Sequence, residues 1–207
     1  MRGNHTETPQ NSIEPKKRNL TVPITPPLSL INRFSLKPFN SSYFNLKKRQ
    51  VGQKIVHYSS FFYPLDNLLQ WSRLYGPKGF YQYQCVVPFA NGKAIIQAIL
   101  NTIAVSGEGS FLAVLKTFGA RQPLGMLSFP QPGITLALDF PNKSQSTLTL
   151  FERLDAIVHE VGGRIYLAKD MRMSPECFEA GYPKLPAFLP FRDRGISSAM
   201  SRRLMGY

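Results

Sequence analysis

The fold of this chain is decided by residues 79–88, which read Gly79-Phe80-Tyr81-Gln82-Tyr83-Gln84-Cys85-Val86-Val87-Pro88. Polar and apolar side chains alternate in this run, which is typical of a β-strand with one buried face. Successive side chains of a strand point to opposite faces, so Gln82 and Gln84 share one face while Tyr83 and Cys85 share the other. Two amides on one face can bind sugar hydroxyls, because each offers two donors and an acceptor. The alternative interpretation is an edge strand whose outer face is simply polar.

The segments that follow predict two helices and three further strands. Helices are expected at about residues 92–107 and 146–161, and strands at about 111–118, 133–140 and 164–167. The order β-α-β-β-α-β predicts an α+β fold, a ferredoxin-like antiparallel sheet with both helices on one face. The apolar stripes of the two helices are interpreted as core.

The N-terminal part of the chain differs in composition from the rest. Residues 1–18 are polar and are expected to form a disordered basic tail. Prolines interrupt residues 19–77, so we expect an irregular connecting segment in which only short helices fit. The main folded domain is expected to cover residues 78–207.

The formal net charge of +13 is concentrated near the N-terminus. The first 60 residues hold ten basic and two acidic residues, a net +8, with basic clusters at 16–18 and 47–49. Such clusters can contact nucleic acid or anionic lipid. No recognised nucleic-acid module accompanies them, so we expect no nucleic-acid partner. A non-catalytic basic binding protein remains one of the alternative functions.

The cysteines and the apolar runs indicate the compartment. Cys85 and Cys177 provide no disulfide framework and no metal-site spacing, so we expect a reducing environment and no metal. No apolar run reaches the roughly 18–20 residues that a membrane span needs, and residues 1–6 lead into no apolar signal core. We expect a cytoplasmic protein, with peripheral membrane contact as an alternative.

Several further motifs follow one another along the chain in a specific order. They are Phe61-Phe62-Tyr63-Pro64-Leu65-Asp66, Trp71-Ser72-Arg73-Leu74-Tyr75-Gly76, Leu127-Ser128-Phe129-Pro130, Leu138-Asp139-Phe140-Pro141, Tyr166-Leu167-Ala168-Lys169-Asp170 and Gly181-Tyr182-Pro183. From about Asn19 onward this series resembles the C-terminal half of the decaprenylphosphoryl-β-D-ribose oxidases. These are FAD enzymes of the vanillyl-alcohol-oxidase superfamily, which also contains the aldonolactone oxidases.

The resemblance implies that residues 78–207 are the substrate-binding cap domain of an FAD-linked oxidase. Family members hold most of the FAD in a longer N-terminal domain, and this sequence has no Gly-rich phosphate-binding loop. The implied partner is therefore an FAD-domain polypeptide. The implied substrate is a lipid-linked sugar, or a sugar lactone if the chain is closer to the aldonolactone oxidases.

The resemblance also assigns substrate-binding residues. Gln82, Gln84 and Lys116 match positions that hold the sugar, and Phe118 matches an apolar wall of the same pocket. Thr135 and Ala137 stand where the family usually has Asn and Cys, which leaves the pocket shape and the exact substrate open. Trp71 and Arg73 match a loop that covers the active site. From its pattern alone, Lys116 is equally an edge lysine that extends into solvent.

Tyr166 and Lys169 match a Tyr-x-x-Lys-Asp element that lies near the flavin and the substrate in the family. A hydride passed to flavin leaves negative charge on the ring, and a fixed cation stabilises that charge. The resemblance therefore implies catalytic and FAD-contacting roles for Tyr166 and Lys169. From the pattern alone, Lys169 instead forms a surface ion pair with Asp170.

These observations predict the substrate-binding part of an FAD-dependent sugar oxidoreductase that oxidises a ribose hydroxyl on a polyprenyl-phosphosugar. The isolated chain is expected to be inactive. The alternatives are an aldonolactone oxidase cap domain, and a non-catalytic basic binding protein or gene fragment.

Overall fold

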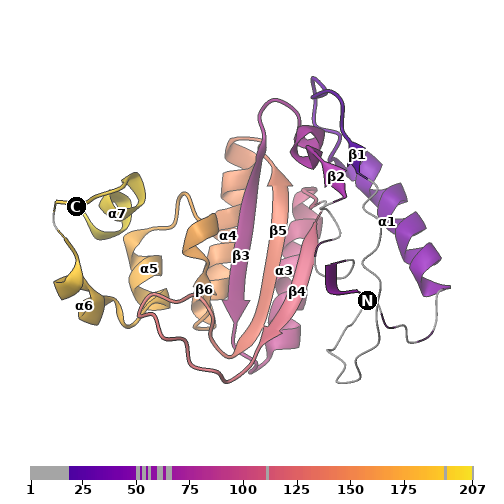
Figure 1. Cartoon of the computed structure of the whole chain (residues 1–207). Coiled ribbons are helices and arrows are strands. Elements are labelled where there is room, and N and C mark those ends of the chain that lie inside the picture. The colour runs from indigo at the N-terminus through magenta and orange to yellow at the C-terminus, as the bar shows by residue number, and fades with distance from the viewer. Residues whose placement is uncertain are drawn as a thin grey trace. The chain divides into compact units, whose positions relative to one another are not determined.

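The computed structural model describes residues 19–49, 52, 55, 57–59, 63, 67–110, 112–193 and 195–206. The chain divides into two compact units, Met1–Gly79 and Phe80–Tyr207, and each is described here by itself (Figure 1). The predicted disordered tail at residues 1–18 lies outside the described residues and stays a prediction.

The N-terminal unit contains a long helix that the sequence analysis did not predict. Helix α1 covers Arg33–Lys48, 16 residues with Pro38 in its interior, so the prediction of short helices only is wrong. The helix begins at a capping box: Asn32 Oδ1 accepts hydrogen bonds from Phe34 N and Ser35 N, and Asn32 N donates to Ser35 Oγ. This cap satisfies the first free amides of the helix and offsets the backbone donor that Pro38 lacks.

The remaining elements of this unit are short. Strand β1 (Leu20–Thr21) pairs in parallel with β2 (Leu68–Leu69), and the 3-10 helix η1 (Trp71–Tyr75) follows. Gly76 ends η1 with φ of 77°, and a Cβ there would lie 3.1 Å from the backbone nitrogen of Ser29. Only glycine combines this conformation with such a close approach without strain.

The second unit is a four-stranded antiparallel sheet in the order β4-β5-β3-β6. Its strands are β3 (Phe80–Val87), β4 (Ala113–Phe118), β5 (Gly133–Pro141) and β6 (Arg164–Ile165). Helix α3 (Gly92–Ser106) connects β3 to β4, and α4 (Gln145–Glu160) connects β5 to β6. Both helices lie on the same side of the sheet (Figure 1). This topology confirms the predicted α+β, ferredoxin-like fold.

The core lies between the sheet and the two helices. Tyr83 and Cys85 pair with Leu138 and Leu136 of β5, and all four are buried against residues of α3 and α4. Burying each large aliphatic side chain stabilises the fold by about 1.5–3 kcal/mol. Because Tyr83 and Cys85 face the helices, the alternating residues of β3 face away from them.

Strand β6 is shorter than predicted. It ends at Ile165 rather than at residue 167, and the chain turns into the 3-10 helix η2 (Leu167–Lys169). The amide of Tyr166 still donates to the carbonyl of Gln84 at 2.8 Å. The turn therefore occurs beside β3, and it brings Lys169 to the open face of the sheet.

Four short elements complete this unit beyond the β6 edge of the sheet (Figure 1): α5 (Pro175–Gly181), α6 (Leu185–Phe188), η3 (Leu189–Phe191) and α7 (Ala199–Met205). An ion pair of 2.8 Å between Arg203 Nη2 and Asp170 Oδ2 connects α7 to the residue after η2. Arg203 Nη1 also donates to the carbonyl of Met173. No helix in the described part of the chain is long and apolar enough to cross a membrane.

Candidate functional site

The helix-free face of the sheet gathers most of the predicted site residues. The register places Gln82 opposite Asp139, Gln84 opposite Ala137, and Lys116 opposite Thr135. Strand alternation puts all of these side chains on the face that the helices do not cover. The sequence prediction that Gln82, Gln84 and Lys116 lie on this face is confirmed.

A line of hydrogen bonds crosses this face. Lys169 Nζ donates to Gln82 Oε1 at 2.6 Å, and Gln82 Nε2 donates to Asp139 Oδ1 at 3.0 Å. The three residues come from η2, β3 and β5, which are far apart in the sequence. We call this line the Lys169–Gln82–Asp139 relay.

The alternative interpretation of Lys169, a surface ion pair with Asp170, is wrong. Asp170 Oδ1 accepts hydrogen bonds from the amides of Arg172 and Met173, and Oδ2 pairs with Arg203. The Asp170 side chain is 4% exposed and stabilises the local backbone. Lys169 instead has a side-chain partner on β3.

Asp139 is the member of the relay to which the sequence analysis assigned no role. Only 3% of the residue is exposed, and its Oδ2 has no hydrogen-bond partner among the described residues. Burial raises the pKa of its carboxyl, while the hydrogen bond from Gln82 and the charge of Lys169 oppose that rise. In the sequence, Asp139 could have been noticed because strand alternation places it on the same face as Thr135 and Ala137.

Gln84 has a separate set of contacts. Its Nε2 donates to Thr135 Oγ1 at 3.3 Å, and that hydroxyl donates to the carbonyl of Cys85 at 2.9 Å. Thr135 is buried, so its side chain orients Gln84 from beneath the open face. Ala137 is half-buried beside them. This pair does not extend to Lys169.

An aromatic cluster lies next to these polar groups. The rings of Phe118 and Phe129 meet edge to face at 5.9 Å, and Phe129 and Tyr166 lie 4.6 Å apart. Phe129 therefore links the predicted wall residue Phe118 to the predicted catalytic residue Tyr166. Sequence reasoning missed this role of Phe129, although the residue stands in one of the ordered motifs.

The structure leaves both interpretations of Lys116 open. The side chain is exposed on β4 and has no hydrogen-bond partner among the described residues. It is available to an anionic or hydroxyl-rich ligand at the open face, and equally to solvent.

The predicted loop residues Trp71 and Arg73 belong to the N-terminal unit, so the structure does not place them relative to the sheet. Arg73 Nη1 donates to the carbonyls of Val22 at 2.9 Å and Pro23 at 2.7 Å. Trp71 meets the ring of Tyr75 edge to face at 6.1 Å. Of residues 61–66, only Tyr63 is among the described residues.

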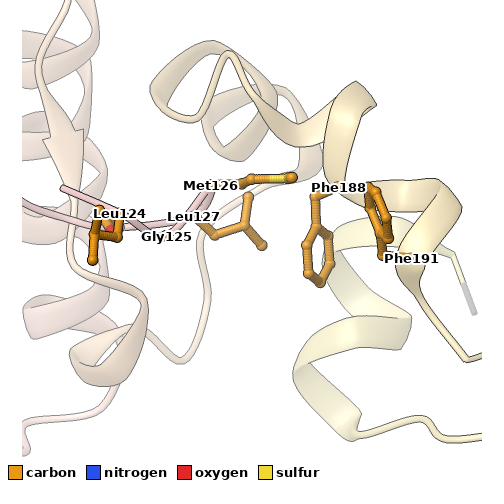
Figure 2. Close-up of a pocket in the computed structure, with 7 residues that line it drawn as sticks. Leu124, Gly125, Met126, Leu127, Phe188 and Phe191 are labelled. Carbon is orange, nitrogen blue, oxygen red and sulfur yellow. The ribbon is translucent and has the colours of Figure 1, made fainter. Parts of the chain in front are cut away.

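A hollow lined by apolar side chains, distinct from the polar face, lies where the 124–128 loop meets η3 (Figure 2). It has a volume of about 510 Å³, and Met126 and Leu127 face Phe188, beside which Phe191 lies. Phe191 is 77% exposed, so the hollow is open to solvent. Apart from the hydroxyl of Ser128, the side chains that line it are apolar.

The described residues offer limited means of holding a cofactor. No group of three His, Cys, Asp or Glu side chains among them is placed to bind a metal ion. The Lys169 ammonium has three donors, of which Gln82 uses one, so two can reach an anionic ring or a substrate oxygen. The Lys169 ammonium is thus held at the open face with donors left for an anionic group.

A comparison with known proteins adds a specific relative. The chain is similar to decaprenylphosphoryl-beta-D-ribose oxidase. It shares 38% identity with the oxidase from Mycolicibacterium smegmatis in an alignment of 190 residues that covers 89% of this chain and 40% of the oxidase. It is also 34% identical over 132 residues to an uncharacterized protein from the mprA 5′ region of Streptomyces coelicolor, covering 61% of this chain and 35% of that protein. No protein-family model matches the chain.

The chain thus spans about 40% of the length of the mycobacterial oxidase. Because the aligned region includes 89% of the chain, the similarity to the oxidase extends over most of the sheet unit. The polar face and its relay therefore lie within a unit that largely resembles part of an oxidoreductase.

Proposed function

We propose that this chain is the substrate-binding portion of an FAD-dependent oxidoreductase that oxidises a ribose hydroxyl on a polyprenyl-phosphosugar. The observation that carries the proposal is the relay, which fixes a cation at 2.6 Å from Gln82 on the same open face as Gln84 and Lys116. A polar face of amides and lysines suits a sugar phosphate, since it offers many donors to hydroxyl and phosphate oxygens. The similarity to the mycobacterial oxidase supports the same reaction class.

The proposal gives the residues on and beside this face the following roles. Gln82, Gln84 and Lys116 hold the sugar, while Phe118 and Phe129 form an apolar wall beside it. Tyr166 and Lys169 would lie toward the reacting hydroxyl and the flavin ring. Bound FAD would supply the hydride acceptor. Lys169 is then placed to stabilise the negative charge that develops as the hydroxyl is oxidised.

The proposal includes a second polypeptide that carries the flavin. The 207 residues contain no Gly-rich phosphate-binding loop. A flavin domain supplied in trans or by fusion would hold the phosphates of FAD and place the ring against the polar face.

The test is reconstitution. The chain is co-produced with the part of the M. smegmatis oxidase that it does not match, and flavin bleaching is followed anaerobically after addition of a polyprenylphosphoryl ribose. Bleaching that requires both polypeptides supports the proposal. A stable, flavin-loaded complex that is not reduced contradicts it. Bleaching by a free sugar lactone alone favours the aldonolactone oxidase alternative.

A further inference from the structure

The orientation of the Gln82 amide depends on what lies at its two ends. A lysine ammonium only donates hydrogen bonds, and an ionised carboxylate only accepts them. Lys169 lies at one end of the amide at 2.6 Å and Asp139 at the other at 3.0 Å. Only one amide orientation satisfies both neighbours, with the carbonyl toward Lys169 and the NH₂ group toward Asp139.

The cost of burying Asp139 indicates that its acceptor oxygen has a purpose. A buried carboxylate with one unpartnered oxygen is unfavourable, and a neutral side chain of similar size would avoid that cost. Asp139 is held firmly, because β5 is paired with both β3 and β4, and its amide donates to Ser110 Oγ at 2.9 Å. It is therefore a rigid acceptor that can orient a more mobile side chain.

We propose that Asp139 is a positioning residue, which fixes the Gln82 amide so that its carbonyl holds the Lys169 ammonium at the open face of the sheet. Asp139 acts through Gln82 and does not touch the substrate. The consequence for the reaction rests on the proposed function above, whereas the positioning itself is a property of the chain alone.

The neighbouring amide provides a matched control. Gln84 lies on the same face of the same strand, but it bonds to the neutral hydroxyl of Thr135. Its contacts do not extend to Lys169. A change at Gln84 therefore perturbs the same surface without breaking the relay.

The first experiment uses the isotope-labelled full chain and NMR detection of the Lys169 ammonium protons. In the unmodified chain we expect slow exchange with water. Asp139→Leu should abolish the signal or speed its exchange at least about tenfold, because the freed amide no longer holds the ammonium. Asp139→Asn should largely restore it, since the Asn carbonyl still accepts from Gln82, and Gln84→Met should leave it unchanged. A folded Asp139→Leu chain with an unchanged Lys169 signal overturns the proposal.

A second measurement covers the case in which Asp139→Leu does not fold. In the unmodified chain, one Gln82 amide proton should be protected from exchange and should show a scalar coupling across the hydrogen bond to the Asp139 carboxyl carbon. Two equivalent, rapidly exchanging amide protons and no coupling would contradict the proposal without any substitution.

The reconstituted enzyme then tests the effect on the reaction. Asp139→Leu should slow flavin reduction on the order of a hundredfold, as small displacements of a catalytic group do. The same change made on top of Lys169→Ala should have little further effect, because both act through one group. If the two substitutions slowed flavin reduction additively, Asp139 would not act through Lys169, and the proposed effect on the reaction would be wrong. If reconstitution gives no activity at all, the proposed function fails while the NMR result still decides the positioning role.

Discussion

The hydroxyl of Tyr83 donates a hydrogen bond to Asp155 Oδ1 at 3.0 Å, which links the central strand β3 to helix α4 inside the core. Asp155 Oδ2 pairs with Arg172 Nη2 at 2.6 Å. Burial raises the pKa of both the Tyr83 phenol and the Asp155 carboxyl. The two groups thus form a buried polar contact on the helical side of the sheet, opposite the candidate site.

Tyr83→Phe should lower the free energy of unfolding by about 1–3 kcal/mol, because it leaves a buried carboxylate oxygen without its donor. Urea denaturation measures the change. Tyr81→Phe is the matched control: its ring also packs on Phe151, but its hydroxyl has no hydrogen-bond partner among the described residues. Tyr81→Phe should lower the free energy of unfolding by less than about 0.5 kcal/mol. Equal losses in the two variants would contradict the role assigned to the Tyr83 hydroxyl.

Asp139 should make stability depend on pH in a specific direction. Its folded-state pKa is raised, so the folded state binds its proton more tightly than the unfolded state does. The stabilisation by that proton is present below the unfolded value and is lost as pH rises through the folded value. Asp139→Asn should therefore become more stable relative to the unmodified chain between pH 4 and pH 7. Urea denaturation at both pH values tests this, and a difference independent of pH would show that Asp139 has no raised pKa.

Lys169 and Lys116 should differ in their kinetic effects in the reconstituted enzyme. Lys169→Ala should slow flavin reduction by a hundred- to thousandfold, or about 2.7–4 kcal/mol of barrier, because its charge acts on charge that develops during the reaction. Lys116→Ala should mainly raise KM, because its contact to the sugar is made equally before and during the reaction. Stopped-flow reduction and steady-state kinetics measure the two effects. If Lys116→Ala slowed flavin reduction and Lys169→Ala mainly raised KM, the roles assigned to the two lysines would be wrong.

The purified chain should be colourless and should oxidise none of the candidate sugars by itself. The reason is that the proposed function assigns the phosphates of FAD to a separate flavin domain. An absorbance spectrum and an oxygen-uptake assay check this expectation. A yellow preparation with stoichiometric FAD would show that this chain holds the cofactor alone.

The strand and helix order of the sheet unit could be predicted because its signals are local. The alternation of polar and apolar residues in 80–87 identifies a strand, and the apolar stripes in 92–106 and 145–160 identify two helices. The order of these elements along the chain is compatible with few sheet topologies. The same alternation correctly placed Gln82 and Gln84 on the open face. In contrast, α1 was missed because Pro38 and the prolines that precede the helix outweighed a capping box at Asn32 and Ser35 that is also readable in the sequence.

The internal connections of the site could not be predicted from local patterns. The relay joins residues 57 and 87 positions apart, and its geometry depends on the register of β3 with β5 and on the turn after β6. Phe129 likewise belongs to one of the ordered sequence motifs. Its contacts with Phe118 and Tyr166 form only when three separate segments come together in the folded chain. Sequence patterns identify the face on which a side chain lies, whereas its partner depends on the tertiary structure.

The Arg203–Asp170 ion pair has a practical consequence for protein engineering. The Asp170 side chain is 4% exposed, so removing Arg203 would leave a buried carboxylate without its counter-charge one residue away from Lys169. A tag or truncation that disrupts Ala199–Met205 would therefore disturb the candidate site from the far end of the chain. Fusions that supply a flavin domain are best joined through the N-terminal side, with this last helix left intact.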